Sequence, residues 1–492
     1  IFGLYILKAI IRFSYKLQVR LISKLMKMYQ SMEYVEYMNR NSAEYVYAIQ
    51  ELVSVFTSRI INLGLRTLCD VFISIAILFL LAWTNIKLLS GLLIFITIVA
   101  VIYDKAIKRS IQRYGKQANE ASTRMLKGVK EGVLGMKELR ILGKSEYFCN
   151  IVHEEATLNA ENLKKYEFML KIPKYFFEFV LIALICLIVI FVSLVEGNLK
   201  QMIPTLTVFG VASIKLIPSL SSISAAIVNI RFNRNAVALL YKDLNISKNH
   251  RPPDLDNKNE YIFNELTLKS INFKYPNSSE LVINNVNFTI KKGESLGLIG
   301  VSGSGKSTLV DIILGLLRPN EGLINLNGNK INEQMSVWQN QVAYLPQEVF
   351  IIDDTIRKNI ALGVKSSEVN EERIIEALEI SRLSEVVERL PKGLDTILGE
   401  NGITFSGGQR QRVSLARAIY HGRKVLIMDE ATSSLDNATE KEVADEIRRL
   451  KGVLTMIIIA HRYTTLRDCD RIYRIDKGRI VEETTFDKLS KN

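Results

Sequence analysis

Cysteine is scarce in this sequence of 492 residues, and its four cysteines lie far from one another. The chain contains no Cys-x-x-Cys pair and no cluster of cysteine and histidine with metal-ligand spacing. This pattern argues against a disulfide scaffold and against a zinc module. The first residues, from Ile1 onward, lack the basic region and the small-residue cleavage site of a secretory signal peptide, and we interpret them as the cut end of a longer helix.

Internal repeats and low-complexity tracts are also absent from the sequence. With 48% hydrophobic and 23% charged residues, the chain is too apolar to be disordered, and it is too long for one compact domain. The net charge of +13 does not by itself indicate a nucleic-acid partner, because membrane proteins show the same balance when lysine and arginine gather in their cytoplasmic loops. We therefore expect at least two domains and no nucleic-acid partner.

Four long apolar stretches occupy the first half of the chain, at 65–83, 88–103, 175–195 and 202–230. A bilayer crossing needs about 20 mostly apolar residues, so we interpret these stretches as membrane spans rather than as buried helices of a soluble protein. The first two are separated only by 84–87, which predicts an antiparallel hairpin.

The segment 104–174, between the second and third stretches, is rich in lysine and arginine. By the positive-inside rule this segment lies in the cytoplasm. The loops at 84–87 and 196–201 are short, hold one lysine each, and are expected on the opposite side. Apolar residues recur in the cytoplasmic segment with few helix breakers, so we expect helices that extend well into the cytosol.

Composition changes sharply near residue 240. The run 245–259 is polar, contains paired prolines and is interpreted as a linker. Beyond it, short β-rich runs alternate with helical patterns, which is typical of an α/β domain with a largely parallel sheet. We therefore expect an N-terminally incomplete all-α transmembrane domain over 1–240, a linker over 241–260 and an α/β domain over 261–492.

A glycine-rich motif follows the apolar strand 296–299 and precedes the helical pattern 308–316. Glycines let backbone amides close around phosphate oxygens, and the N-terminus of a helix adds partial positive charge. Lys306 is expected to reach the β- and γ-phosphates, and Ser307 to reach Mg²⁺. The sequence thus predicts a nucleotide-binding phosphate loop made of Gly300, Val301, Ser302, Gly303, Ser304, Gly305, Lys306, Ser307 and Thr308.

Two further apolar strands carry polar residues to the edge where ligands bind in open α/β sheets. The run 425–428 is followed by Asp429 and Glu430. Asp429 can hold Mg²⁺ through water, and Glu430 can polarise the attacking water. The run 457–460 is followed by His461. Beside a phosphate loop, these residues predict an ATPase site.

Ser406, Gly407, Gly408 and Gln409 open another helix, with the serine at its N-cap. This is a second anion-binding terminus, and one chain has no use for two triphosphate cradles on one nucleotide. The natural role of the second is to sandwich ATP between two chains. The segment resembles the signature motif of ABC ATPases, with Phe405 where leucine is commoner.

The resemblance to ABC ATPases extends over residues 275–461 and implies further roles. It implies that Tyr275 stacks on adenine, and that Gln347 joins Mg²⁺ and water to the membrane domain. It also implies that Asp436 lies in a loop that crosses the dimer interface, and that His461 touches the γ-phosphate. The cofactors it implies are ATP and Mg²⁺, and the metal ligands are Ser307, Gln347 and Asp429.

The membrane half resembles that of type IV exporters, in which six helices per subunit reach into the cytosol. With four complete spans, this chain would lack the first helix and most of the second. In that family short transverse coupling helices touch the ATPase, and the resemblance implies such helices near 31–44 and 127–140.

Lys215 lies within the fourth apolar stretch, three residues before Pro218. An ammonium at mid-membrane costs several kcal/mol unless it faces a wet cavity or an anion, so Lys215 is a candidate for the substrate cavity. Bacterial lipid-linked oligosaccharide flippases are similar here, with a basic residue a few positions before a proline in the last helix. The alternative is a lysine that snorkels or pairs with an acid such as Glu178.

We therefore expect a homodimeric, multi-pass protein of the bacterial inner membrane, surrounded by membrane lipids, with a cytoplasmic ATPase domain. It would use ATP hydrolysis to export or flip a lipid-linked oligosaccharide or another amphipathic lipid. A multidrug or peptide exporter, or a membrane-anchored ABC regulator that does not pump, are the alternatives. Glu430 argues against a regulator, in which this base is often degenerate, and the apolar stretches argue against a soluble ABC ATPase.

Overall fold

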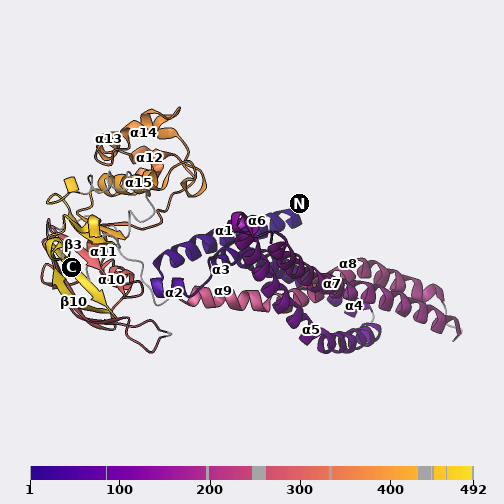
Figure 1. Ribbon diagram of the computed structural model, residues 1–492. Coiled ribbons are helices and arrows are strands. Elements are labelled where there is room, and N and C mark those ends of the chain that lie inside the picture. The colour runs from indigo at the N-terminus through magenta and orange to yellow at the C-terminus, as the bar shows by residue number, and fades with distance from the viewer. Residues whose placement is uncertain are drawn as a thin grey trace. The chain divides into compact units, whose positions relative to one another are not determined.

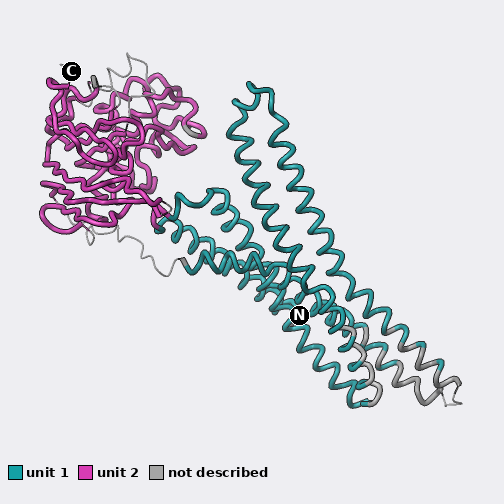
Figure 2. The backbone as a smooth tube through the Cα atoms, turned by 60° about the horizontal axis from the view of Figure 1, so that its bottom comes forward, with its two compact units in different colours: residues 1–32, 36–252 teal, residues 33–35, 253–492 magenta. Residues whose placement is uncertain are grey.

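The computed structural model describes residues 2–84, 86–194, 199–246, 262–276, 278–331, 335–429, 445, 448–460 and 463–489 (Figure 1). The chain divides into two compact units (Figure 2). One comprises residues 1–32 and 36–252, and the other comprises residues 33–35 and 253–492.

The first unit is helical throughout its described residues. Its two longest helices, α5 (Ile86–Leu134) and α7 (Glu146–Leu194), have 49 residues each and lie alongside one another. A helix of this length spans about 74 Å, more than twice the ~30 Å of the hydrocarbon core of a bilayer. Either helix is therefore long enough to cross a membrane and continue beyond it. The other elements are α1 (Phe2–Ser31), α2 (Tyr34–Met38), whose first two residues fall in the other unit, α3 (Ser42–Tyr47), the π-helical segments η1 (Ala48–Leu52) and η2 (Val55–Asn62), α4 (Leu63–Thr84), α6 (Met136–Ile141), α8 (Leu199–Phe232) and α9 (Arg234–Ile246).

Two helical segments among the described residues are long and apolar enough to cross a membrane, Ser42–Thr84 and Gly210–Phe232. The first contains the first expected span, and the second overlaps the fourth. Large apolar side chains on α4 face outward, since Phe72, Phe79 and Trp83 are 72%, 71% and 85% exposed. Lipid is the natural cover for such a surface. The second and third expected spans lie in α5 and α7, where many side chains fall outside the described residues.

Close packing joins α5, α7 and α8. A Cβ on Gly115 of α5 would collide with the backbone carbonyl of Phe232, so only glycine lets the two helices approach this closely. The Phe232 ring stacks on Tyr166 of α7, with the ring centroids 4.0 Å apart. The Tyr166 hydroxyl in turn donates a hydrogen bond to Asn229 of α8. The three long helices are thereby fixed in register.

A buried ion pair joins the turn after α2 to α9. Arg40 donates through both terminal guanidinium nitrogens to Asp243, at 2.9 and 3.1 Å, and the Tyr29 hydroxyl donates to the same carboxylate at 2.7 Å. Asp243 is 4% exposed, and the guanidinium lies over the Tyr45 ring, 4.8 Å from its centroid. Burial and the bond to Asp243 raise the pKa of Tyr29. Bidentate pairs of this kind are among the stronger polar contacts in proteins.

A six-stranded sheet forms the centre of the second unit, in the order β10-β9-β3-β8-β7-β6. β3 is parallel to β8 and β9, and β7 is parallel to β6 and β8, whereas β10 is antiparallel to β9. Every residue of β3 and β8 is buried, as expected where both faces of a parallel sheet are covered. The strands are β3 (Ser295–Ile299), β6 (Val342–Leu345), β7 (Val425–Asp429), β8 (Thr455–Ile459), β9 (Arg471–Asp476) and β10 (Arg479–Thr484).

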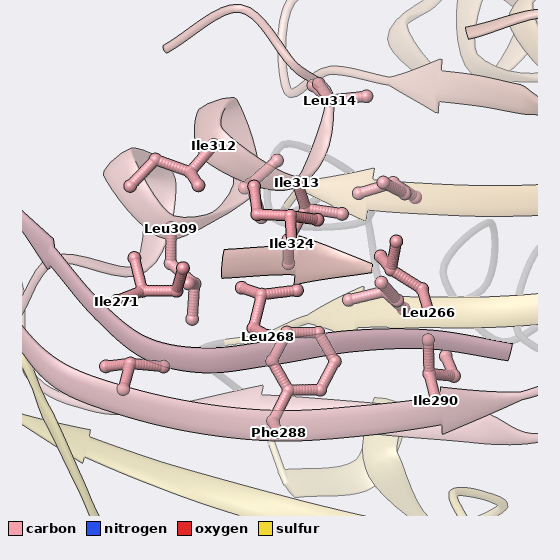
Figure 3. Packing of buried hydrophobic residues seen from close by; sticks show 14 of the residues in the cluster. Leu266, Leu268, Ile271, Phe288, Ile290, Leu309, Ile312, Ile313, Leu314 and Ile324 are labelled. Carbon is pink, nitrogen blue, oxygen red and sulfur yellow. The ribbon is translucent and has the colours of Figure 1, made fainter. Parts of the chain in front are cut away.

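A second, antiparallel sheet has four strands in the order β2-β1-β4-β5. Its apolar face packs on α10 (Lys306–Ile313), and Figure 3 shows Leu268 and Phe288 from this sheet in one cluster with Leu309 of the helix. Tyr34 and Val35, from the short segment that belongs to this unit, also pack against the cluster. The strands are β1 (Glu265–Phe273), β2 (Ile283–Lys291), β4 (Glu321–Leu326) and β5 (Asn329–Lys330).

A third part of the second unit is helical and has its own core, in which Ile356, Ile374 and Val413 are fully buried. Its helices are α12 (Ile356–Ile360), α13 (Glu371–Ile380), α14 (Ser384–Glu388) and α15 (Gly407–Tyr420); α11 (Met335–Gln339) and α17 (Phe486–Leu489) lie elsewhere in the unit. An all-α unit followed by an α/β unit confirms the expected fold class.

Candidate nucleotide-binding site

The glycine-rich loop lies between the buried strand β3 and the N-terminus of α10. Gly303 and Gly305 have φ angles of 78° and 102°, which side chains with a Cβ rarely adopt. A Cβ on Gly300 would collide with the carbonyl oxygen of Ile475. The loop therefore keeps its shape only with glycine at these positions, and glycine-rich loops with left-handed residues are the kind of backbone that forms anion-binding sites.

Lys306 is held inside this loop. Its side chain is 6% exposed, and Nζ donates to the carbonyl oxygens of Gly300 at 2.8 Å and Val301 at 3.0 Å. A buried ammonium needs such partners. Ser307, the next residue, is exposed, and Thr308 is buried. The loop thus presents a positive charge and a hydroxyl at the start of α10, a combination suited to phosphate and Mg²⁺.

Tyr275 lies beside the same helix. Its hydroxyl and Oγ1 of Thr308 are 3.2 Å apart, and its ring meets Phe273 edge-on with centroids 5.1 Å apart. The ring is half-buried against the core of the unit. The structure therefore places Tyr275 next to the phosphate loop, and its stacking on adenine stays a prediction.

Negative charge gathers at the end of β7. Asp429 accepts a hydrogen bond from the Tyr344 hydroxyl at 3.3 Å. Burial, followed by the charge of Asp429, raises the pKa of Asp311 on α10 to about 6. Burial and the same carboxylate also raise the pKa of Tyr344. A divalent cation at this point would relieve the repulsion between the carboxylates, so the residues present fit Mg²⁺.

Asp311 and Tyr344 were not expected from the sequence. Asp311 follows Ser307 by four residues, so the two share one face of α10. Tyr344 precedes Gln347 by three residues, on the strand that pairs with β7. Both spacings are visible in the sequence, but the pairing of β6 with β7 is not.

Gln347 is exposed and lies two residues beyond β6, at the same end of the sheet as Asp429 and the phosphate loop. The carboxyl ends of parallel strands meet at one edge of the sheet. Gln347, Asp429 and the phosphate loop therefore converge at that edge. Among the described residues, no group of three or more histidine, cysteine, aspartate and glutamate side chains could hold a metal alone. Mg²⁺ commonly binds proteins through one or two carboxylates together with substrate phosphates, and Asp429 fits that pattern.

The signature segment begins α15 as expected. Ser406 is the N-cap, and its Oγ accepts a hydrogen bond from the Gln409 backbone N–H at 3.3 Å. The Gln409 side chain accepts from the Ser406 N–H at 2.9 Å, which completes a capping box. Ser406 is exposed, Gly408 is buried, and Phe405 is 5% exposed in the helical core. Phe405 thus anchors the segment, and the helix N-terminus faces solvent.

The described part of the site does not include every predicted residue. Glu430, Asp436 and His461 lie outside the described residues. Lys215 is in α8 of the other unit, where it is exposed. Glu178, the alternative partner for Lys215, lies 3.9 Å from Lys174 instead.

Comparisons with known proteins give three results. The family profile described as "ABC transporter" matches residues 283–433. The ATP-dependent lipid A-core flippase of Cupriavidus pinatubonensis is 30% identical over 450 residues, covering 90% of this chain and 74% of that protein, and that of Alkalilimnicola ehrlichii is 30% identical over 424 residues, covering 84% and 70%. The structure of a bacterial Atm1-family ABC exporter with ATP bound matches with a TM-score of 0.84 at 22% identity, covering 98% of this chain and 84% of that one. At that identity the structural likeness shows the fold.

Proposed function

The chain belongs to the ABC transporter family, and from this premise we propose that it is an ATP-driven exporter that flips a lipid-linked oligosaccharide or another amphipathic lipid. The observation that carries the proposal is the phosphate loop at the sheet edge shared with Asp429 and Gln347, in a chain that aligns with most of the length of two lipid A-core flippases. ATP hydrolysis supplies the free energy for transport.

The ATP site is built from the phosphate loop and the neighbouring strand ends. The loop N–H groups and Lys306 bind the phosphates, and Tyr275 stacks on the base. Ser307, Gln347 and Asp429 would hold Mg²⁺, which would neutralise charge on the phosphates when bound. Glu430 accepts a proton from the attacking water, and His461 contacts the γ-phosphate. Entry of the phosphates releases Lys306 from the carbonyl oxygens of Gly300 and Val301.

A second copy of the chain completes each site. The exposed N-terminus of α15, with Ser406, Gly407, Gly408 and Gln409, has free N–H groups beyond those used by the capping box. We infer that it contacts the triphosphate bound to the partner in a homodimer, with Asp436 in the loop that crosses the interface. We also infer that the coupling helix expected near 31–44 links transport to hydrolysis.

The protein lies in the bacterial inner membrane, with the ATPase unit in the cytoplasm and membrane lipids around the helices. The lipid A-core flippases among its relatives favour a lipid substrate. Lys215 on α8 would attract an anionic headgroup such as a lipid pyrophosphate. Two alternatives are an exporter of drugs or peptides and a membrane-anchored regulator that does not pump.

Stimulation of ATP hydrolysis by candidate substrates distinguishes a lipid substrate from a drug or peptide substrate. Full-length protein in nanodiscs should hydrolyse ATP faster with a polyprenyl-pyrophosphate saccharide than with hydrophobic drugs or peptides. Lys215→Ala should lose the stimulation and keep basal hydrolysis, because the charge is not part of the ATP site, whereas Lys215→Arg should keep both. Stimulation by drugs alone would assign the protein to multidrug export, and an unaffected Lys215→Ala variant would make Lys215 structural.

A further inference from the structure

The backbone that follows β6 is held by side chains from α15. Nε2 of Gln411 donates hydrogen bonds to the carbonyl oxygens of Pro346 at 3.0 Å and Gln347 at 3.2 Å. Further along the same helix, Arg417 donates to the carbonyl oxygen of Phe350 at 3.1 Å. Three backbone acceptors within five residues are thus tied to one helix, so this segment moves with α15.

The Gln411 side chain is oriented to donate hydrogen bonds to the backbone after β6, and it does not stabilise α15. It is 3% exposed, and its Oε1 is buried without a hydrogen-bond partner among the residues that the structure describes. A buried oxygen left unpaired costs about 1–3 kcal/mol. Reversal of the amide would bring this oxygen against the carbonyl oxygens of Pro346 and Gln347, so the orientation is fixed by the two donated bonds. An apolar side chain would avoid the cost, which indicates that the donors have a role.

The role follows from what the two ends of the contact carry. Gln347 projects an exposed side chain at the sheet edge next to Asp429 and the phosphate loop. Gln411 lies five residues into the helix that begins at the exposed N-cap Ser406. The contact therefore connects the helix that meets a partner's nucleotide with the glutamine that meets the chain's own nucleotide.

We propose that Gln411 is a positioning residue for ATP hydrolysis, which holds the Pro346–Gln347 backbone so that the Gln347 side chain reaches bound Mg²⁺-nucleotide. The inference rests on the proposed function, in which Gln347 is a ligand of Mg²⁺ and water. A shift of the signature helix on nucleotide binding then shifts Gln347 of the same chain.

Hydrogen exchange in nucleotide-free, full-length protein tests the contact without catalysis. Gln411→Met keeps the length of the side chain and removes both donors. The rate of hydrogen exchange should increase several-fold in peptides that span 346–350, because loss of these two hydrogen bonds lowers the free energy of local opening. The matched control is Gln339→Met, since the Gln339 amide also donates to a backbone carbonyl of this unit, that of Leu314 at 3.2 Å. The control should leave exchange in 346–350 unchanged.

A double-mutant cycle tests the route to catalysis. Gln411→Met should lower kcat about tenfold, an ordinary effect of misplacing a catalytic group, and leave KM for ATP within about twofold. In a Gln347→Ala background, Gln411→Met should have no further effect, because the group that it positions is gone. A merely structural residue would lower activity equally in both backgrounds.

Two results would overturn the proposal. One is unchanged exchange in 346–350 in the Gln411→Met variant, which would show that the contact does not restrain the loop. The other is an equal loss of kcat with and without Gln347, which would show that Gln411 acts by another route. Failure of the proposed function looks different, because the wild-type protein would then show no Mg²⁺-dependent ATP hydrolysis while the exchange experiment still reports on the contact.

Discussion

At the scale of single residues, electrostatics dominates the region where α10 approaches β7. Asp311 is partly buried near Asp429, and its pKa is raised to about 6 by burial and by the neighbouring charge. Above that pH the nucleotide-free protein contains two carboxylates that repel each other, and Asp429 also accepts a hydrogen bond from the Tyr344 hydroxyl. Bound Mg²⁺ would offset this repulsion, so the site is less stable empty than occupied.

Asp311→Asn should stabilise the nucleotide-free protein at pH 7.5 and have little effect at pH 4.5. The folded state binds the Asp311 proton more tightly than the unfolded chain, so the wild type loses stability as pH rises from about 4 to about 6. The gain should be about 1 kcal/mol, below the full linkage value because Asp311 is partly exposed. Urea unfolding followed by the fluorescence of buried Trp338, in a Trp83→Phe background, measures it. An equal effect at both pH values would refute the assigned pKa shift.

The sequence led us to expect a phosphate loop and Asp429 as site residues, because that expectation needs only local spacing around one strand and one helix. It did not predict Asp311, Tyr344 or Gln411. Each of these acts across elements that are far apart in the chain, such as Gln411 and Gln347, which are 64 residues apart. Only the order and register of β6, β7 and α15 bring them together.

At the scale of elements, α9 is held to the turn after α2 by a polar cluster of Arg40, Asp243 and Tyr29. Asp243 accepts from Arg40 and Tyr29, and the three side chains are largely enclosed. Both partners must be present, because a buried carboxylate without its cation is far less stable than the pair. The turn carries the chain from α2 into α3, so its position depends on this contact.

Arg40→Met should therefore destabilise the first unit by about 3 kcal/mol, because it leaves the Asp243 carboxylate buried without its cation. The double variant Arg40→Met/Asp243→Leu should recover most of that loss, since it buries two apolar side chains in place of the ion pair. Thermal unfolding in detergent compares the variants. A double variant as unstable as Arg40→Met would show that packing, and not the unpaired charge, determines the effect.

Elements with a strong local signal were predicted with accurate bounds. The strands expected at 296–299 and 425–428 are β3 and β7, each one residue longer than expected, because buried parallel strands are continuous apolar runs. The π-helical segments η1 and η2 and the capping box at Ser406 were not predicted. The π-helical segments depend on packing against α1 and α9, and the capping box depends on the orientation of the Gln409 side chain. The spacing of apolar residues encodes neither feature.

At the scale of the whole molecule, the two units carry different parts of an ATP-driven transporter. The helical unit has segments long and apolar enough to cross a membrane, and the α/β unit has the phosphate loop and the capped helix α15. In the proposed dimer, α15 of a second copy completes the binding site of a nucleotide that is bound to the phosphate loop. Closed two-fold assemblies of this kind contain two equivalent sites.

Mixing two inactive variants tests the shared site. Lys306→Ala removes the ammonium of the phosphate loop, and Ser406→Glu places a carboxylate at the N-terminus that should meet the partner's phosphates. Each variant alone should be inactive. Co-expressed with different affinity tags and purified as a mixed dimer, they should regain partial ATPase activity, because one of the two sites is then built only from intact parts. No recovery in the verified mixed dimer would contradict a shared site.

Translocation of a fluorescent lipid-linked pyrophosphate saccharide by the full-length protein in liposomes shows whether ATP hydrolysis drives transport. With Mg²⁺-ATP the wild type should move the lipid between leaflets. Glu430→Gln should bind ATP equally well, lose about 10² to 10⁴ in hydrolysis rate because one positioned base is missing, and lose flipping in the same proportion. Flipping that persists in Glu430→Gln, or proceeds in the wild type without ATP, would contradict transport driven by hydrolysis.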